Sequence, residues 1–367
     1  MSQPDIGSAA AQPTAAGTGG AGAPPGPAER AAVEAELQRR QYWWVASLGF
    51  FREAALIPVL VVLILVGTVV SPAFFTSANL FGIGQQISAL GVTAIGEALI
   101  LLTGGMDLSL ESTYGLAPMV AAWLIVPASN FGLGTDLNPF VGILILLAVG
   151  AIVGMANGLL IVKGRLNGFV VTLGMTIVLA GVQLGIVKGQ TVFNMPNAFI
   201  YLGYQSLGPV PVSVIVTAVI FVLVGLFLRY HRAGRAIYAV GGNREAARAA
   251  GIRVDRVRIG VYVGGGILAA IGGLMEAGRV SAVTGQQGYQ EGVIFPVFAA
   301  AVIGGVSLQG GRGNMLGVAT GVILLGLVQN ILDLANVSNY WIEAITGGVI
   351  LFALILSRIV GGEKRAE

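Results

Sequence analysis

Residues 140–162 read FVGILILLAVGAIVGMANGLLIV, and this stretch decides the fold class because it contains no charged side chain. A helix needs about 20 apolar residues to cross the hydrocarbon core of a bilayer, and this run is long enough. Gly150, Gly154 and Gly158 recur at every fourth position, a spacing that lets a second helix approach closely in lipid. The stretch therefore predicts a membrane-spanning helix that packs tightly against a neighbour.

The composition of the whole chain agrees with this interpretation. Of its 367 residues, 55% are hydrophobic and 10% are charged, against about 25% charged residues in an ordinary soluble domain. The absence of Cys excludes disulfides, thiolate nucleophiles and Cys-based metal sites. The single histidine, His231, cannot form a His-pair metal site, and we expect it to be solvated among the neighbouring arginines. No metal site is predicted.

Apolar runs recur after Glu53 and predict an all-α polytopic membrane protein, with about ten transmembrane helices in a Gly-rich bundle. Two of the predicted spans, 109–127 and 292–309, are interrupted by Gly or Pro. The predicted spans are 54–70, 84–103, 109–127, 140–162, 168–187, 210–228, 259–280, 292–309, 314–333 and 341–357.

The basic residues orient these spans, because Lys and Arg concentrate on the cytoplasmic side of membrane proteins. With a cytoplasmic N-terminus, ten spans leave 18 of the 20 Lys and Arg inside and only Lys188 and Arg279 outside. We therefore expect a multi-pass protein with both termini in the cytoplasm.

The regions outside the spans differ in composition. Residues 1–28, rich in Ala, Gly and Pro, predict a disordered cytoplasmic leader, because they can bury too little apolar surface to order. Residues 29–53 include an aromatic cluster and predict a helix on the cytoplasmic membrane surface, with a solvated helix as the alternative. Residues 54–358 would form the transmembrane domain, and 359–367 a cytoplasmic tail.

Small residues spaced four apart recur in three later spans, at Gly181 and Gly185, Gly260 and Gly264, and Gly317 and Gly321. Together these pairs predict a compact helix bundle. LTGGMDLSL at 102–110 also resembles VIGGVSLQG at 302–310. Because many transporters contain duplicated halves, we interpret this echo as an internal duplication, with coincidence as the alternative.

The sequence contains little that points to an enzyme. It has no GxxxxGK[ST] phosphate-binding loop, and the Gly-rich stretch 260–273 lies inside an apolar span. Glu97 and Asp107 are acids at or near membrane depth and are therefore functional candidates. They are ten residues apart, near opposite faces of a helix, which argues against a paired acid/base site. Asp107 equally fits a cap of the following helix.

Neutral polar and aromatic side chains inside the spans fit a solute pathway instead. Hydroxyls and amides can exchange hydrogen bonds with a neutral solute, while aromatic faces can cover its apolar side. Hydrogen bonding between helices is the alternative role for each of them. Together with Glu97 and Asp107, the candidates are Ser109, Tyr114, Trp123, Asn157, Thr172 and Gln183.

The segment 229–258 is polar, with eight arginines against Glu245 and Asp255. Attraction to an anionic membrane leaflet explains the charge but not the order of the residues. Within it, NREAARAAG at 243–251 has a cap at Asn243, helix-forming residues and Gly251 as a stop, which predicts a short cytoplasmic helix. Because two turns of exposed helix are unstable alone, we expect a partner surface to hold it.

Glu245, Ala246 and Ala247, followed by Gly251, match the EAA---G loop of ABC importer permeases. The surrounding sequence resembles the ribose-type sugar permeases in particular, over roughly residues 50–358. The stretches that carry the resemblance are 102–110, 157–174, 238–257, 302–313 and 337–354.

This resemblance implies a permease subunit, not an enzyme, that imports a pentose, hexose or related polyol by alternating access across a bacterial plasma (inner) membrane. Cytoplasmic ATPase subunits would bind the ATP, so this chain would need no cofactor. A solute-binding protein outside would deliver the sugar, a second permease copy or paralogue would complete a dimer, and no nucleic acid would take part. The segment from Glu245 to Gly251 would couple to the ATPase, and Arg244 and Arg248 would meet acceptors on it.

Three alternatives stay open on the sequence alone. A related permease would import nucleosides or branched-chain amino acids. A stand-alone secondary transporter would need an ion-coupling cluster, for which Glu97 and Asp107 are a thin basis. A membrane-embedded enzyme lacks an acid/base or metal constellation.

Overall fold

The computed structural model describes residues 56–338, 340–348 and 351. The chain divides into two compact units, Met1–Phe50 and Phe51–Glu367, and every described residue belongs to the second. The predicted leader at 1–28, the surface helix at 29–53 and the tail at 359–367 lie outside the described residues.

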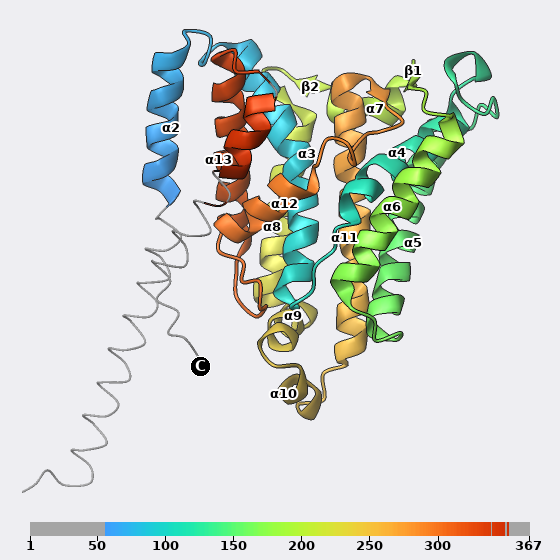
Figure 1. The fold of residues 1–367 in the computed structure, drawn as a ribbon, viewed down its shortest axis with the longest axis vertical. Coiled ribbons are helices and arrows are strands. Elements are labelled where there is room, and N and C mark those ends of the chain that lie inside the picture. Colours follow the sequence, from blue (N-terminus) through green and yellow to red (C-terminus); the bar gives the residue numbers. More distant parts are fainter. Residues whose placement is uncertain (1–55, 339, 349–350, 352–367) are drawn as a thin grey trace, which may run out of the picture. The chain divides into compact units, whose positions relative to one another are not determined.

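Helices make up almost all the regular structure of the described residues (Figure 1), which confirms the predicted all-α class. The longer helices are α2 (Leu56–Val70), α3 (Ser77–Leu102), α4 (Leu110–Ile125), α5 (Pro139–Val162), α6 (Gly168–Val187), α8 (Val212–Tyr230), α11 (Val254–Val280) and α13 (Met315–Leu334). The shorter ones are η1 (Ala128–Asn130), α7 (Asn197–Tyr204), α9 (Arg232–Gly242), α10 (Arg244–Ala249) and α12 (Ile294–Ile303). Residues 340–348 are also helical.

Six of the described helices are long and apolar enough to cross a membrane, namely α3, α5, α6, α8, α11 and α13. The chain is therefore a multi-pass membrane protein, but the predicted count of ten spans is not confirmed. α12 has 10 residues and ends before Gly304 instead of continuing to 309, and α4 has 16 residues and contains Pro118. Both are shorter than the roughly 17 residues that a transmembrane helix needs, and both are largely buried against other helices.

Polar side chains determine where several helices begin. Asn138 and Asn167 accept N–H groups from the first turns of α5 and α6, which start within one residue of the predicted spans. α3 starts at Ser77, after the cap Thr76, rather than at 84, and α11 starts at Val254 rather than at 259. The prediction missed these first turns because their polar residues do not belong to the apolar run.

α11 is the central helix of the described bundle and packs between α3 and α5 (Figure 1). Small residues allow the contact: a Cβ atom at Gly154 of α5 would lie 2.2 Å from the carbonyl oxygen of Tyr262. On α11 itself the closest contacts are made by Gly265 and Gly266, whereas the predicted pair at 260 and 264 faces open space. The prediction of close packing through glycine is thus right, but the face assigned on α11 is wrong.

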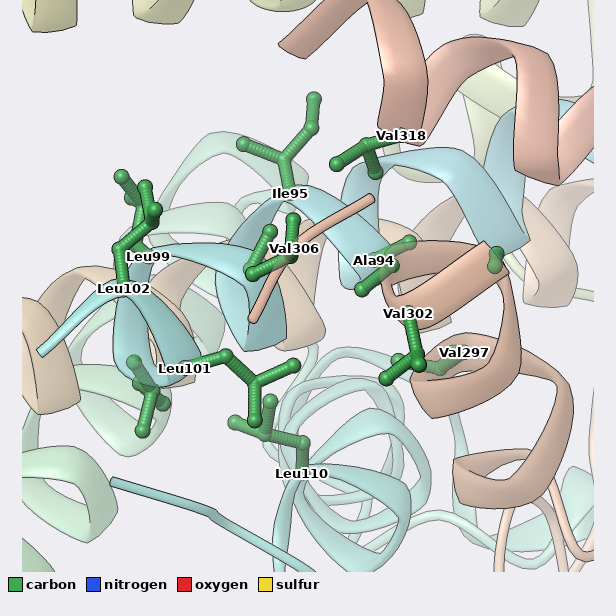
Figure 2. Packing of buried hydrophobic residues seen from close by; sticks show 14 of the residues in the cluster. Ala94, Ile95, Leu99, Leu101, Leu102, Leu110, Val297, Val302, Val306 and Val318 are labelled. Carbon is green, nitrogen blue, oxygen red and sulfur yellow. The ribbon is translucent and has the colours of Figure 1, made fainter. Parts of the chain in front are cut away.

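The largest apolar core joins α3, α12 and α13 (Figure 2). Leu101 of α3, Val297 of α12 and Val318 of α13 are buried in it. α13 lies close to α12 because Gly317 and Gly321 face the backbone at the end of α12 without an intervening side chain. The small-residue pair predicted in this span is confirmed as a packing contact.

The ends of the helices far from α10 are joined by two short antiparallel strand pairs and by α7 (Figure 1). β1 (Val192–Phe193) pairs with β4 (Ala282–Val283), and β2 (Ser206–Leu207) pairs with β3 (Val210–Pro211). The first pair ties the connection after α6 to the connection after α11. Such short elements carry no periodic pattern, which is why the sequence did not predict them.

The two stretches of the predicted internal echo end their helices in the same way. After α3, Gly104 has φ of +68° and the N–H of Gly105 donates to the carbonyl of Ile100. After α12, Gly305 has φ of +88° and the N–H of Val306 donates to a carbonyl five residues back. Both are Schellman-type C-caps, one residue out of the predicted alignment. The duplication itself stays a prediction.

Candidate functional site

α10 is the short helix predicted within the basic segment. The side-chain oxygen of Asn243 accepts the backbone N–H groups of Glu245 and Ala246, each at 2.9 Å, and so caps its first turn. Gly251 follows the helix with φ of +81°, a left-handed conformation that glycine adopts without strain. The start, body and stop predicted from NREAARAAG are confirmed.

The chain itself supports α10, contrary to the expectation that a partner surface must hold it. Ala247 is the only buried residue of the helix and packs in a small apolar cluster with Val240 of α9 and Val254 of α11. The N–H of Ile252 also donates to the carbonyl of Ala247. The rest of α10, including Glu245, is exposed, and its surface is therefore open to a partner.

The two arginines of α10 contact this chain, although both were expected to meet acceptors on an ATPase. The Arg244 guanidinium donates from one nitrogen to the carbonyl oxygens of Thr103 (3.2 Å) and Gly104 (3.0 Å). It thereby connects α10 to the turn between α3 and α4, and the expectation is wrong for this group. Arg248 lies 3.6 Å from Asp255, which also binds Lys163. Both pairs are exposed and contribute little to stability.

α9 was missed by the sequence analysis, which treated residues 229–242 as loop. His231 caps this helix by accepting the N–H of Ala233 at 3.2 Å and stacks on Phe227, so it is not merely a solvated side chain. Tyr238 donates its hydroxyl to the carbonyl of Gly313 at 2.8 Å. Burial raises the pKa of Tyr238, so the phenol keeps the proton that makes this bond. α9 thus links α10 to the connection between α12 and α13.

Four predicted pathway residues meet in one fully buried cluster beside the α3–α4 turn, which we call the polar cluster. The Asn157 amide donates to the Ser109 hydroxyl (2.7 Å) and to the Asp107 carboxylate (3.1 Å). The Ser109 hydroxyl donates to Asp107 at 2.7 Å, and the backbone N–H of Asp107 lies 3.5 Å from a carboxylate oxygen of Glu97. The cluster joins α3, the turn and α5.

The polar cluster overturns the expectation that Glu97 and Asp107 point to opposite faces of one helix. α3 ends at Leu102, and the chain then turns back so that Asp107 returns to the level of Glu97. The cap interpretation of Asp107 holds in part, because its carboxylate accepts the N–H of Ser109 at 2.9 Å just before α4. Ser109, the first flanking residue of α4, forms no side-chain cap itself.

Two acceptor atoms of the polar cluster, Glu97 Oε2 and Asn157 Oδ1, are buried and have no partner among the described residues. Buried polar atoms normally have a hydrogen-bond partner, which here must come from outside the protein. Water molecules and the hydroxyl groups of a solute are donors that suit both atoms. The geometry can therefore bind and release neutral hydroxyl groups.

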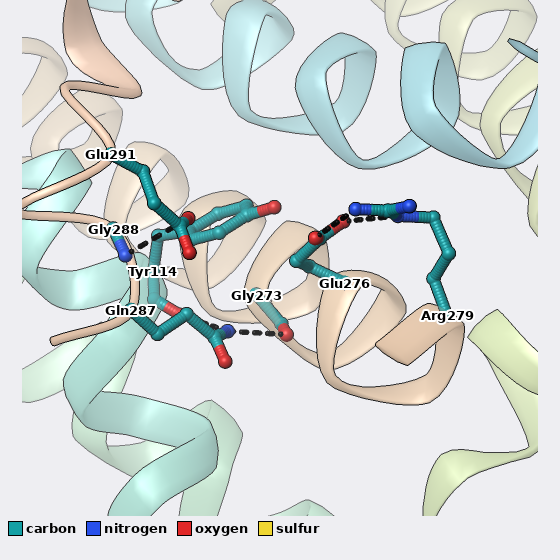
Figure 3. A network of polar contacts seen from close by, with 7 residues as sticks. All are labelled: Tyr114, Gly273, Glu276, Arg279, Gln287, Gly288 and Glu291. Atoms are coloured by element: carbon teal, nitrogen blue, oxygen red, sulfur yellow. Dashed lines mark hydrogen bonds and ion pairs between the residues drawn. The ribbon is translucent and has the colours of Figure 1, made fainter. Parts of the chain in front are cut away.

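A second polar group lies between α4, α6 and α11, closer to the α7 end. Gln183 donates to the backbone carbonyls of Thr284 (3.1 Å) and Gln287 (3.3 Å). Gln287 in turn donates to the carbonyl of Gly273 at 3.1 Å, while Tyr114 is buried beside it (Figure 3). Gln183 and Tyr114 are thus brought together, but they stand apart from the polar cluster.

The remaining predicted pathway residues do not join either group. Thr172 is buried, and its hydroxyl donates to the carbonyl of Gly168 in its own helix at 2.9 Å. Trp123 packs at the edge of an apolar cluster. Their roles are helix bonding and core packing, as the alternative for these residues stated.

Several acids expected to be solvated are not. Glu276 forms two hydrogen bonds with Arg279, at 2.6 and 2.9 Å (Figure 3). Glu111 is 7% exposed and accepts the N–H of Ile294, at the start of α12, at 3.3 Å. Both sites depend on helix contacts that a single span does not reveal. Within the described part of the chain, no group of three or more His, Cys, Asp or Glu could hold a metal ion.

Comparison with known proteins identifies relatives over most of the chain. The ribose import permease protein RbsC of Escherichia coli (strain K12) is 36% identical over 324 residues, covering 86% of this chain and 96% of that protein. RbsC of Bacillus subtilis (strain 168) is 32% identical, covering 82% and 90%. The galactose/methyl galactoside import permease protein MglC of Escherichia coli (strain K12) is 32% identical, covering 87% and 97%. No solved structure matches this chain.

Residues 79–354 match the family described as branched-chain amino acid transport system / permease component. The match includes α10, the polar cluster and all six long apolar helices apart from the first two residues of α3. On these grounds, the chain belongs to this family of transport-system permeases.

Proposed function

We propose that this protein is the membrane subunit of an ATP-driven importer that carries a monosaccharide, namely a pentose, a hexose or a related polyol, into the cytoplasm. The similarity to ribose and galactose import permeases over more than four fifths of the chain carries this proposal. The chain would lie in the plasma (inner) membrane of a bacterium, with the α10 end and both termini in the cytoplasm. The concentration of arginines around α9 and α10 supports this orientation.

α10 would be the element to which an ATPase subunit couples. Its exposed residues, Glu245 among them, leave a surface for a partner, while Ala247 anchors the helix to α9 and α11. Arg244 connects the helix directly to the α3–α4 turn, so a displacement of α10 reaches the polar cluster through one side chain. In this scheme the partner binds and hydrolyses ATP, and this chain performs no covalent step and needs no cofactor.

The polar cluster supports a sugar pathway through its chemistry. Asp107, Ser109 and Asn157 offer hydrogen bonds that the hydroxyl groups of a neutral solute can replace one at a time. Alternating access would follow from a change in the packing of α3, α5 and α11 around it. A solute-binding protein would deliver the sugar at the α7 end, and a second permease copy or a paralogue would complete the complex.

Co-purification with the ATPase encoded beside the gene tests the coupling role. We expect the wild-type chain to retain the ATPase, and Glu245→Ala and Gly251→Val to lose it, since valine cannot adopt φ of +81° without strain. Arg232→Ala, an exposed change on α9, is the matched control and should retain the ATPase. Retention by all variants would contradict a coupling role for α10.

Uptake by proteoliposomes that contain the complex tests the substrate class. We expect ATP-dependent accumulation of labelled ribose or galactose and none of leucine. A second candidate, import of branched-chain amino acids, is favoured by the description of the matched family. Accumulation of leucine without either sugar would establish that alternative. Solute movement by the chain without an ATPase would instead indicate a secondary transporter.

A further inference from the structure

A cavity of about 400 Å³ opens at the α10 end, between the α3–α4 turn, the α5–α6 connection and α11. Its volume lies in the range of roughly 300–1,000 Å³ found for small-molecule sites. Met106 of the turn, Phe169 of α6 and Tyr262 of α11 form part of its walls. The side chains of Arg244 and Arg258 also line it, so two cations face one cavity from two different helices.

The two arginines lack an anionic partner. Among the described residues, neither Arg244 nor Arg258 forms an ion pair with a carboxylate, whereas Arg248 and Lys163 nearby both do. The Nε atom of Arg258 is buried without a hydrogen-bond partner. Arg244 uses one terminal nitrogen for backbone carbonyls, which leaves its other donors for a ligand. Two guanidinium groups beside one cavity favour an anion between them.

We propose that this cavity binds a phosphate group through Arg244 and Arg258. Guanidinium groups bind phosphate oxygens in a bidentate manner, which two arginines from separate helices can do together. Leu166 and Phe169, 51% and 52% exposed, provide apolar surface for the organic part of the ligand. The phosphate can belong to a soluble phosphate ester or to an anionic phospholipid, because basic pockets at the cytoplasmic side of membrane helices hold lipid head groups.

A bound phosphate would tie together three elements. Arg244 belongs to α10, Arg258 belongs to α11, and Met106 belongs to the turn that also contains Asp107. Occupancy therefore restrains α10 relative to α11 and the polar cluster. If the proposed importer function holds, on which this consequence rests, a bound phosphate slows ATP-coupled transport.

Binding is measured on the purified chain alone, so the result does not depend on transport. The detergent-solubilised protein is titrated with inorganic phosphate and with glucose 6-phosphate at constant ionic strength by microscale thermophoresis. We expect saturable binding that Arg258→Gln weakens about tenfold or more, as the loss of a charge-assisted hydrogen bond requires. Arg256→Gln removes the same charge two residues away, at an exposed position outside the cavity, and should bind as the wild type does.

A second arm identifies a lipid source. The protein is reconstituted in nanodiscs of phosphatidylcholine with or without phosphatidylglycerol, and the lipids that remain bound are identified by native mass spectrometry. Retention of phosphatidylglycerol that Arg258→Gln loses and Arg256→Gln keeps assigns the site to a lipid. Stronger binding of glucose 6-phosphate than of inorganic phosphate, without such retention, assigns it to a soluble ester.

Two results would overturn the proposal. One is the absence of saturable binding of either phosphate compound together with no selective retention of phosphatidylglycerol. The other is equal binding by Arg258→Gln and the wild type, with both monodisperse on gel filtration. Arg258→Lys provides a folded variant that keeps the charge, and it should bind more weakly than the wild type because it lacks the planar fork. Sugar uptake that continues normally in either case would leave the proposed function intact.

Discussion

α5 and α6 carry the same sequence pattern but use it differently. Both are apolar helices with glycines spaced four apart. In α5, Gly150 and Gly154 lie directly against the backbone of α11, whereas Gly181 and Gly185 of α6 have no neighbouring atom within 4 Å of where a Cβ would be. The spacing therefore shows that a helix can be approached closely, but it does not show whether another part of the same chain does so.

The polar residues of the two helices differ in the same way. Asn157 lies between two packing glycines of α5, so its amide reaches Asp107 and Ser109 on other elements. Thr172 of α6 is equally buried but bonds to a carbonyl of its own helix. A buried polar side chain contributes to a site only where the helix that carries it faces other polar groups.

The largest effect is expected from Gly154→Leu. The new side chain would collide with the backbone of Tyr262 and Val263, which cannot move without separating α5 from α11. We expect a loss of about 3 kcal/mol in the free energy of unfolding, at the upper end of overpacking effects. Thermal unfolding of the solubilised protein measures it. Gly181→Leu, the matched change on α6, should change stability by less than about 0.5 kcal/mol. Equal losses would show that the two glycine faces are equivalent.

Asn157→Leu tests the polar cluster against α6. The change removes two donors from the buried Asp107 carboxylate and one from Ser109, and we expect it to cost about 2 kcal/mol. Thr172→Val, which removes only a bond within its own helix, should cost less than about 1 kcal/mol. Thermal unfolding and sugar uptake are measured for both. A larger effect of Thr172→Val on uptake would place the pathway at α6 instead.

Gln183→Leu examines the one side chain of α6 that reaches other elements through hydrogen bonds. Its amide bonds to the carbonyls of Thr284 and Gln287, so its loss should cost about 1 kcal/mol. Hydrogen exchange of residues 284–291 is expected to increase, because these bonds hold the connection between β4 and α12. Unchanged exchange there would show that the β1–β4 pair alone holds the connection.

The smallest effect is expected from Gly181→Ala. Alanine has the higher helix propensity, and the site has room for a methyl group, so stability should increase by about 0.5 kcal/mol. The same change at Gly150, where a Cβ would lie 2.4 Å from the carbonyl oxygen of Gly266, should be destabilising. If Gly181→Ala instead lowers the mass of the complex in light scattering, the α6 face meets a second copy.

Local sequence signals were sufficient for α10 and insufficient for the polar cluster. Asn243 and Gly251 act within a few residues of their own positions, so the cap and stop could be predicted without any knowledge of the fold. Glu97 and Asp107 meet only because α3 ends at Leu102 and the chain reverses there. The signal that could have predicted the reversal is the Gly104–Gly105 pair, which the sequence analysis used only as a sign of internal duplication.

The amino-acid sequence by itself determined the membrane class, the position of the long apolar helices and the capped helix at 243–251. These features follow from hydrophobicity and capping, which depend on each residue and its near neighbours. The tertiary structure alone decided that α4 and α12 are short buried helices, that Arg244 binds the α3–α4 turn, and that α5 packs through its glycines. Each of these depends on which helix faces meet, and hydrophobicity does not encode that choice in lipid, where every helix face is apolar.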